Sequence, residues 1–359
     1  MNASNEKTKI LLLPLTGTHG ASSRYRVHQY VPFLEEAGFQ IKTWPAVGNN
    51  IYERRTNKPT AINKLIWLLA RALRRIAALF FVRKYDVIFL QRETMPFGFP
   101  IIDLAICRLA SRVVFDFDDA IYTAAEKHSG LIFKLADPRR AERIFECCDV
   151  VIAANQTLAA YARQSANKVV VIPTALDFAK YRSAAGNKSD LPTIGWIGSP
   201  FTAFYLKNLF PVFSNLTKKF TFEVKCIGAD FSEQVDFHLT CQPWASEREI
   251  ADIKSFDIGI MPLTDNEWSK GKSGLKLLQY LAAGVAAVAS PVGVNKEIIS
   301  HEQNGLFANK IEEWEYSLAK LLADEAFRCK LADSAKQTFP EKFNVKVTAG
   351  QLIQVFESL

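Results

Sequence analysis

The chain has 359 residues, a hydrophobic content of 49%, a charged content of 23% and a formal net charge of +7. This length exceeds one ordinary hydrophobic core and fits two domains, and the composition excludes an intrinsically disordered chain. The positive charge favours anionic partners (nucleotides, nucleic acid or a lipid surface) without selecting among them. The six cysteines lack the spacing of metal ligands, so we expect reduced thiols in a cytoplasmic protein.

Apolar runs alternate with helical patterns along the first half of the chain. KILLLPL, at residues 9–15, predicts a buried strand, and a helix capped by Ser22 or Ser23 is expected to run to Ala37 and to stop at Gly38. The later runs are FQIKTWP, YDVIFLQ, RVVFDFD, DVVIAAN and KVVVIPT. Short β-branched runs separated by helices predict a parallel sheet covered on both faces.

A polar stretch without periodicity, residues 178–192, predicts a linker between two domains. The alternation then resumes with TIGWIG, FEVKCIG, DIGIMPL and VAAVAS. The predicted fold class is therefore α/β, with two Rossmann-like doubly wound domains at residues 1–177 and 178–344. The carboxyl ends of their strands are expected to face a common cleft.

Residues 62–83 form a long apolar segment that Arg71, Arg74 and Arg75 interrupt. Charges in the middle of the run make it a poor transmembrane span. One interpretation is a basic amphipathic helix that lies on an anionic membrane, with Trp67 near the interface. The other is an ordinary helix that covers the sheet and exposes an arginine stripe to solvent.

Glycines and arginines follow the first strand in the segment TGTHGASSRYR. Gly17 and Gly20 would allow the backbone to approach a ligand, and the following helix start would point its amides at it. Arg24 and Arg26 are candidate phosphate or acceptor contacts, or else solvated arginines. The segment lacks the Gly-x-Gly-x-x-Gly pattern of dinucleotide-binding proteins.

Three carboxylates crowd the end of the predicted strand FDFDDA, namely Asp116, Asp118 and Asp119. Carboxylates at the carboxyl end of a strand in an α/β fold lie where chemistry usually occurs, so Asp118 and Asp119 are the candidate catalytic residues. The alternative is that they cap the next segment. His128 follows in a loop, where a histidine is more often solvated than catalytic.

The stretch WSKGKSGLKLLQYLAAG places Lys272 and Lys276 around Ser273 and Gly274 at the start of a helix. Cations are unfavourable at the electropositive end of a helix, and the arrangement is favourable when an anion binds there. We predict a diphosphate site that differs from the Walker loop, whose spacing is absent. The alternative is a solvated basic cap.

Five stretches together resemble the GT-B glycosyltransferases, specifically glycosyltransferase family 4. They are GASSRYRVHQYVPFLEEAG, ERIFECCDVVIAANQTLAAYA, VVVIPTALD, IGWIGSP and the run from DIGIMPL to NGLFA. The resemblance covers nearly the whole chain. It implies two Rossmann-like domains, with a C-terminal helix at residues 345–359 that packs back onto the first domain.

The family's donor-site pattern is only partly present. Its Glu-x7-Glu pair falls on Gly271 and Gln279, so both acids are absent, although Gln279 could hydrogen-bond the ribose of the donor. An arginine of the family falls near Ser199, which follows Gly198 in the second domain's first glycine turn. The resemblance implies that the two lysines of the diphosphate site supply the missing positive charge.

The resemblance implies a glycosyltransferase, hexosyltransferase-like and usually retaining. It would move a sugar from a nucleotide-diphosphate sugar to a glycan or lipid-linked acceptor in cell-surface polysaccharide or glycoconjugate synthesis. No metal or other cofactor is expected, and no nucleic acid, because the basic residues lack interleaved aromatic groups. The expected location is the cytoplasm, at the inner face of the membrane. The alternatives are a non-catalytic nucleotide-sugar-binding subunit of a glycan assembly complex, and a GT-B-type epimerase or phosphorylase.

Overall fold

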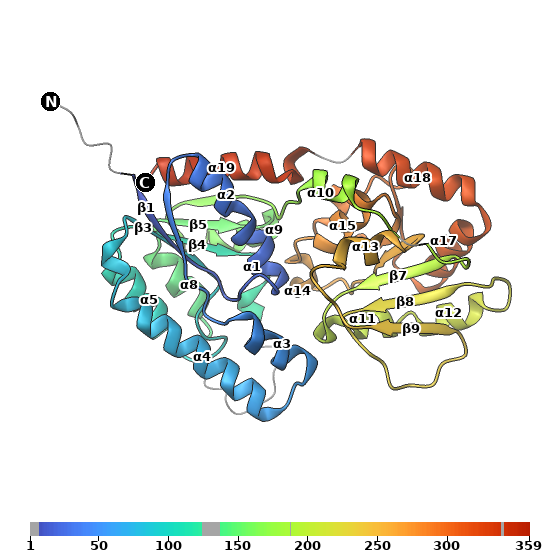
Figure 1. The fold of residues 1–359 in the computed structure, drawn as a ribbon, viewed down its shortest axis with the longest axis horizontal. Helices are drawn as coiled ribbons and strands as arrows, with labels where there is room; N and C mark the ends of the chain where they lie inside the picture. Colours follow the sequence, from blue (N-terminus) through green and yellow to red (C-terminus); the bar gives the residue numbers. More distant parts are fainter. Residues whose placement is uncertain (1–6, 124–136, 187, 339–340) are drawn as a thin grey trace. The chain divides into compact units, whose positions relative to one another are not determined.

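The computed structural model describes residues 7–123, 137–186, 188–338 and 341–359. The chain forms two compact units, each built on its own parallel sheet (Figure 1). Unit 1 comprises Met1–Ala175, Gly271–Ser273 and Val345–Leu359, and unit 2 comprises Leu176–Lys270 and Gly274–Asn344.

The sheet of unit 1 has the strand order β2-β1-β3-β4-β5-β6, and every pairing is parallel. Each of the six apolar runs predicted as strands contains one of them, and the sequence expectation of a doubly wound parallel sheet is confirmed. Because β2 and β3 lie on opposite sides of β1, the strand order reverses there. The strands are β1 (Lys9–Leu13), β2 (Gln40–Thr43), β3 (Val87–Gln91), β4 (Val113–Phe117), β5 (Val150–Ala153) and β6 (Val169–Val171).

The prediction of one continuous helix that runs to Ala37 is wrong, because the structure has two shorter helices there. The chain leaves helical geometry at Val27, whose φ is −132°, and passes through a short 3-10 turn before the next helix begins at Val31. Pro32, in the first turn of that helix, lacks an amide donor and favours a new helix start. The helices of unit 1 are α1 (Ala21–Arg26), α2 (Val31–Glu36), α3 (Asn49–Asn57), α4 (Ala61–Leu79), α5 (Ile101–Leu109), α8 (Arg140–Cys147), α9 (Gln156–Ala162) and α19 (Val345–Glu357).

The C-terminal helix α19 is part of the core of unit 1 (Figure 1). Leu352 and Phe356 pack in one buried cluster with residues of β1, β3 and α2. The hydroxyl of Tyr30 donates to Thr348 Oγ1 at 3.0 Å, and both side chains are buried. Unit 1 is therefore completed by residues that follow unit 2 in the chain.

Both sequence interpretations expose the arginines of helix α4, and the structure contradicts this for two of the three. Arg71 and Arg75 are buried rather than exposed, and their guanidinium groups donate to backbone carbonyls: Arg71 to Glu93, and Arg75 Nη2 to Leu13 at 2.6 Å. Trp67 is also buried, under the guanidinium of Arg71 at 4.7 Å from its ring centroid. The arginine stripe therefore joins α4 to the sheet, and the apolar side chains face outward. None of the described helices is long and apolar enough to span a membrane.

The sheet of unit 2 has the order β12-β11-β10-β7-β8-β9, again with parallel pairings. The chain proceeds from β7 to one side of the sheet and then returns to the other side with β10. The strand order therefore reverses between β7 and β10, which is where α/β folds usually bind ligands. The strands are β7 (Thr193–Ile197), β8 (Glu223–Ile227), β9 (His238–Gln242), β10 (Ile258–Met261), β11 (Ala286–Ala289) and β12 (Leu306–Phe307).

Part of the stretch predicted as a linker is helical. Asp177 caps helix α10 by accepting a hydrogen bond from the amide of Ala179 at 3.1 Å, and Tyr181 anchors the helix by its buried ring. The helices of unit 2 are α10 (Phe178–Ser183), α11 (Phe204–Lys207), α12 (Phe210–Leu216), α13 (Glu249–Lys254), α14 (Glu267–Lys270), α15 (Leu275–Ala283), α16 (Asn295–Ile298), α17 (Ile311–Ala323) and α18 (Glu325–Gln337).

Candidate functional site

The carboxyl end of β7 carries a cation held over an aromatic ring. The amine of Lys276, in the first turn of α15, lies 4.3 Å from the ring centroid of Trp196 on β7. Gly198 follows the strand so closely that a Cβ there would lie 2.4 Å from the Trp196 ring and 2.8 Å from the lysine amine. Gly198 is therefore required by this packing, and Ser199 continues the turn by accepting from the amide of Thr202 at 2.9 Å.

The start of α15 adds backbone donors to this corner. Gly274, the residue before the helix, has a φ of +72°, a conformation that favours glycine. The first amides of a helix have no partner within it and form the positive end of its dipole. Lys276 thus adds a formal charge to an end that is already electropositive. An anion at this position would interact favourably with both.

Of the two lysines of the predicted diphosphate site, Lys276 lies on helix α15 and Lys272 precedes it. Helix α15 begins at Leu275, and Lys272 and Ser273 belong to unit 1. Lys272 Nζ lies 2.9 Å from Asp119 Oδ1, and its backbone carbonyl accepts from Asn155 Nδ2 at 3.1 Å. Lys272 is therefore an ion-pair partner of a predicted catalytic carboxylate.

Gln279 lies inside unit 2. It is buried on α15, and its Nε2 donates to the hydroxyl of Tyr181 at 3.1 Å. A side chain held in this way ties α15 to α10, so a contact with a ribose would first require this hydrogen bond to break. Gly271, the other position of the family's acidic pair, belongs to unit 1, where a Cβ would lie 2.8 Å from that of Ala120.

Asp118 and Asp119 lie together just after β4 in unit 1, as their sequence position predicts. Arg92 bridges them, with its Nη1 at 3.8 Å from Asp118 Oδ1 and at 3.8 Å from Asp119 Oδ2. Burial alone would disfavour the charged form, but Lys272 and Arg92 together hold the pKa of the Asp119 carboxyl below its usual value. Asp119 is thus a carboxylate at neutral pH and cannot serve as a general acid there.

Asp118 has fewer polar contacts than Asp119. Within the described part of the chain, its buried Oδ1 has no hydrogen-bond partner, although Arg92 is near enough for an ion pair. A carboxylate oxygen with unused acceptor capacity can receive a hydroxyl hydrogen bond from a ligand. Asp118 is consequently the better placed of the two to accept a hydrogen bond from a ligand.

Sequence reasoning missed Arg92, which the fold places at the centre of this cluster. It follows β3 with a φ of +61°, in the left-handed region that non-glycine residues seldom adopt. Its amide donates to the Asp116 carbonyl at 2.8 Å. Such a conformation costs on the order of 1 kcal/mol and is found preferentially at functional sites. The available signal was its position next to a buried strand end.

Arg26 is structural, contrary to the sequence expectation of a ligand contact. It is buried and pairs with buried Asp116 through two contacts, of which Nε to Oδ2 is 3.1 Å. Burial would lower the pKa of Arg26, but the Asp116 carboxylate outweighs it and raises this pKa above the usual value. Arg24 stays half-buried in the last turn of α1, 4.8 Å from the ring centroid of Tyr25. His128 lies outside the described residues.

The two glycines after β1 are explained by packing within unit 1. A Cβ at Gly17 would lie 2.2 Å from Asn49 Oδ1, and one at Gly20 would lie 1.9 Å from Thr16 Oγ1. Both positions therefore require glycine whether or not a ligand approaches them. The loop follows β1, beside the point where the strand order of unit 1 reverses, so it remains a candidate contact region.

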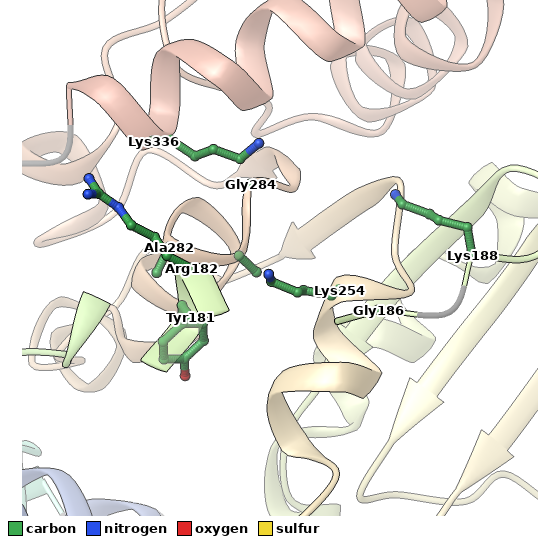
Figure 2. Close-up of a pocket in the computed structure, with 9 residues that line it drawn as sticks. Tyr181, Arg182, Gly186, Lys188, Lys254, Ala282, Gly284 and Lys336 are labelled. Atoms are coloured by element: carbon green, nitrogen blue, oxygen red, sulfur yellow. The ribbon is translucent and has the colours of Figure 1, made fainter. Parts of the chain in front are cut away.

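A basic cavity of about 400 Å³ lies elsewhere in unit 2 (Figure 2). Lys254 ends α13, and Lys336 crosses over Gly284 at the end of α15. Cations at helix C-termini are stabilised by the dipole, and Lys336 also contacts Asp333 at 3.1 Å. These helix ends precede β10 and β11, so the cavity lies at the amino edge of the sheet. It is therefore not the predicted donor site.

Comparisons with known proteins agree with this architecture. Several solved structures cover almost the whole chain, and the likeness to them concerns the fold. A sucrose-phosphate synthase from Thermosynechococcus elongatus has a TM-score of 0.72 at 14% identity and covers 98% of this chain and 99% of its own. Anabaena HepE, solved in complex with UDP and glucose, has a TM-score of 0.70 at 14% identity, with 98% and 100% covered. The chain has the GT-B fold of glycosyltransferases.

Sequence comparison finds a match to one family over part of the chain. Residues 221–324 match the family model "Glycosyl transferases group 1". An uncharacterized glycosyltransferase of Methanocaldococcus jannaschii, MJ1069, is 30% identical over 134 residues, which is 37% of this chain and 31% of that protein. The chain thus matches about a third of the length of this curated relative. The residues that match this model lie almost entirely in unit 2 and include the start of α15.

Proposed function

We propose that the protein is a glycosyltransferase that uses a nucleotide-diphosphate sugar. The support is the group 1 domain at residues 221–324 and the fold shared with HepE, which has been solved with UDP-glucose. The donor's diphosphate binds at the start of α15, and the transfer retains the anomeric configuration. The acceptor is a glycan or a lipid-linked glycan of cell-surface polysaccharide or glycoconjugate synthesis.

The observation that carries the proposal is the position of the Lys276 amine. It combines a formal charge with the amides of the α15 start, beside the tight turn at Gly198. Negative charge develops on the nucleoside diphosphate as the glycosidic bond breaks, and preorganised donors at that position stabilise the transition state. An amine and backbone amides can supply this stabilisation, so the proposal needs no metal ion.

Donor binding is the direct test of the proposal. A panel of nucleotide-diphosphate sugars should raise the unfolding temperature for the correct donor, because that donor binds the native state. Lys276→Met keeps an apolar stem over Trp196 and removes the charge. Loss of one charged hydrogen bond costs about 1.5–3 kcal/mol, an affinity decrease of about 10- to 150-fold.

The matched control is Lys330→Met, at an exposed lysine of α18. It removes the same charge from the chain without touching the α15 start. Equal donor affinity in the Lys276→Met and Lys330→Met proteins would refute the diphosphate site. For a donor that binds, NMR of the product's anomeric proton distinguishes retention from inversion.

A non-catalytic, nucleotide-sugar-binding subunit is the second candidate. It is favoured by Gly271 and Gln279, which stand where the family has its two acids, and by the buried Gln279–Tyr181 hydrogen bond. Turnover of the donor by the purified chain, with or without added acceptor, separates the two candidates. A donor-binding chain that shows no transfer across a panel of lipid-linked acceptors would favour the subunit. Turnover without an acceptor-linked product would instead indicate an epimerase or phosphorylase.

The apolar side of α4 supports an acceptor at a membrane. Its exposed residues recur every three or four positions along one side of the helix, opposite the buried arginines. We name this side the α4 apolar face: Ile62, Leu65, Ile66, Leu69, Leu73, Ile76 and Phe80. Isolated exposed apolar residues need no explanation, whereas a continuous row of them indicates an interaction surface.

The occupant of this face is proposed to be an anionic bilayer, such as the inner face of a cytoplasmic membrane. Residues 54–85 contain nine arginines and lysines and no acidic residue. Six of the basic residues are exposed: Arg54, Lys58, Lys64, Arg74, Arg83 and Lys84. Each adds on the order of 1 kcal/mol of attraction to an anionic surface. Binding of the intact chain to vesicles with and without anionic lipid tests this occupant.

A further inference from the structure

Three of the six cysteines come together in unit 1, although Cys107 lies 41 positions before Cys148 in the sequence. Cys107 lies on α5, Cys147 is the last residue of α8, and Cys148 follows it directly. Their sulfur atoms all lie within 4.8 Å of one another, and those of Cys107 and Cys148 are 3.8 Å apart. The sequence expectation that the cysteines lack metal-ligand spacing therefore does not extend to their arrangement in space.

The separations fit three ligands of one ion better than a disulfide. Zinc–sulfur bonds of about 2.3 Å place sulfur atoms around one zinc ion about 3.8–4.0 Å apart. A disulfide requires two sulfur atoms about 2.05 Å apart, and it would leave the third cysteine of the cluster without a role. The 3.8 Å pair is already at the distance for a shared ion, and the other sulfurs need to move by less than about 1 Å.

The surroundings of the cluster also suit a bound cation. Cys148 is buried, whereas Cys107 and Cys147 are half-buried, which leaves a route for an ion to enter. The cluster lies at the C-terminal end of α8, the negative end of the helix dipole, where a cation is favoured. The Cys147 thiol points back into this end, since its sulfur donates to the Ile144 carbonyl at 3.1 Å.

We infer that Cys107, Cys147 and Cys148 form a binding site for a thiophilic closed-shell cation, Zn²⁺ or Cu⁺. Soft thiolate ligands select these ions over harder ones. On binding Zn²⁺, each thiol releases its proton to solvent and each sulfur forms one bond to the ion. Three protons leave, and the site of one zinc and three thiolates carries a net charge of −1. A solvent molecule supplies the fourth ligand for tetrahedral Zn²⁺, and Cu⁺ needs none.

The site would fasten two crossover segments of unit 1 to each other. Helix α5 joins β3 to β4, and the end of α8 leads into β5. The bound ion would therefore connect the helices that precede and follow β4 in the chain, and β4 is the strand directly before Asp118 and Asp119. Because the ion binds only the folded arrangement of the three sulfurs, it raises the stability of the folded chain.

The test uses the full chain, metal-free and fully reduced. In a background that lacks the other cysteines (Cys226→Ala, Cys241→Ala and Cys329→Ala), one equivalent of Zn²⁺ or Cu⁺ should bind, measured by competition with a chromophoric chelator. Ion binding should also raise the unfolding temperature. Titration with Cd²⁺ as a spectroscopic substitute should give a thiolate-to-metal absorption band in the ultraviolet.

Loss of a residue that only hydrogen-bonds to a metal ligand weakens metal binding by about 10- to 100-fold. Cys107→Ser removes a ligand itself, so in the same background it should weaken ion binding by more than this. Cys147→Ala is a second variant at a half-buried position, and circular dichroism confirms that each variant folds. Binding of Zn²⁺ alone indicates the tetrahedral site, and binding of Cu⁺ alone the trigonal one; either supports the inference. No uptake of either ion, or uptake unchanged by both variants, overturns it. Donor binding at Lys276 is a separate readout and does not enter this result.

Discussion

Replacing two residues of the α4 apolar face should release the protein from anionic vesicles without unfolding it. Leu73 exposes 63% of its surface and Phe80 84%, and neither is part of the core of unit 1. Glutamine at both positions keeps the helix and the net charge. Full burial of either side chain contributes about 1.5–3 kcal/mol. Scaled by these exposed fractions, the two together should contribute about 3 kcal/mol to bilayer binding, an about 100-fold change in the partition coefficient.

The assay is flotation of the protein with vesicles of phosphatidylcholine, with and without phosphatidylserine, at low and high salt. The matched control is Tyr316→Gln, on α17 of unit 2. Tyr316 is aromatic like Phe80, and its exposed fraction of 69% lies between those of Leu73 and Phe80. High salt should weaken binding of the unmodified chain by screening the lysines and arginines. Equal binding of the Leu73→Gln/Phe80→Gln and Tyr316→Gln proteins would refute the role of the α4 apolar face. A chain that does not float with anionic vesicles at low salt would refute membrane binding altogether.

Three further outcomes follow from buried charges in unit 1. Arg75→Met should lower the free energy of unfolding by about 1–3 kcal/mol per carbonyl left without its donor, whereas Arg74→Met should have a smaller effect; urea denaturation measures both. Asp118→Asn should reduce sugar transfer more than stability, and full turnover in this variant would make the carboxylate structural. Burial raises the pKa of Asp103 to about 6, so its contribution to stability is lost as pH rises from about 4 to 6. The free energy of unfolding of the Asp103→Asn protein, relative to that of the unmodified chain, should therefore rise by up to about 3 kcal/mol between pH 4 and pH 7. A difference in urea denaturation that does not change with pH would contradict this.

The strands of the core were predictable because burial on both faces leaves a continuous apolar signal. The well-buried strands β1, β3, β4 and β5 of unit 1 were found from such runs, and so were β7, β8, β10 and β11 in unit 2. The edge strands β2 and β6 were also found, although they are less buried. Strand β9 was missed because it lies at the edge of the sheet, and its sequence, HLTCQ, is partly polar and exposed. Strand β12 has only two residues, Leu306 and Phe307, too few to show any period.

The inward arginines of α4 could not be predicted from local pattern. A helix with apolar residues and arginines was expected to bury the former and expose the latter. Here the carbonyls of Leu13, Pro14 and Glu93 offer buried acceptors at the sheet edge, and the guanidinium groups satisfy them. Such partners are distant in the sequence, so only the fold reveals them.

The candidate site was predictable in its position and only partly in its partners. Lys276 was identified because a cation at a helix start is unfavourable without an anion, and Gly198 because it follows a predicted strand in a glycine turn. The ring of Trp196 under the amine was not identified, because a tryptophan in a buried strand is ordinarily explained by core packing alone. Arg26 was misassigned because its partner, Asp116, lies 90 residues away in the sequence.

The place of α19 in unit 1 has a consequence for synthesis on the ribosome. Unit 1 cannot bury the surface that receives Leu352 and Phe356 until α19 has emerged. At about 5–20 residues per second, the stretch between Ala175 and Val345 takes roughly 10–30 s to translate. Nearly all of unit 2 is made within that interval and can finish first, so the order of folding can be the reverse of the order of translation. Until then the nascent first half exposes an apolar groove, and it is the species on which a chaperone would act.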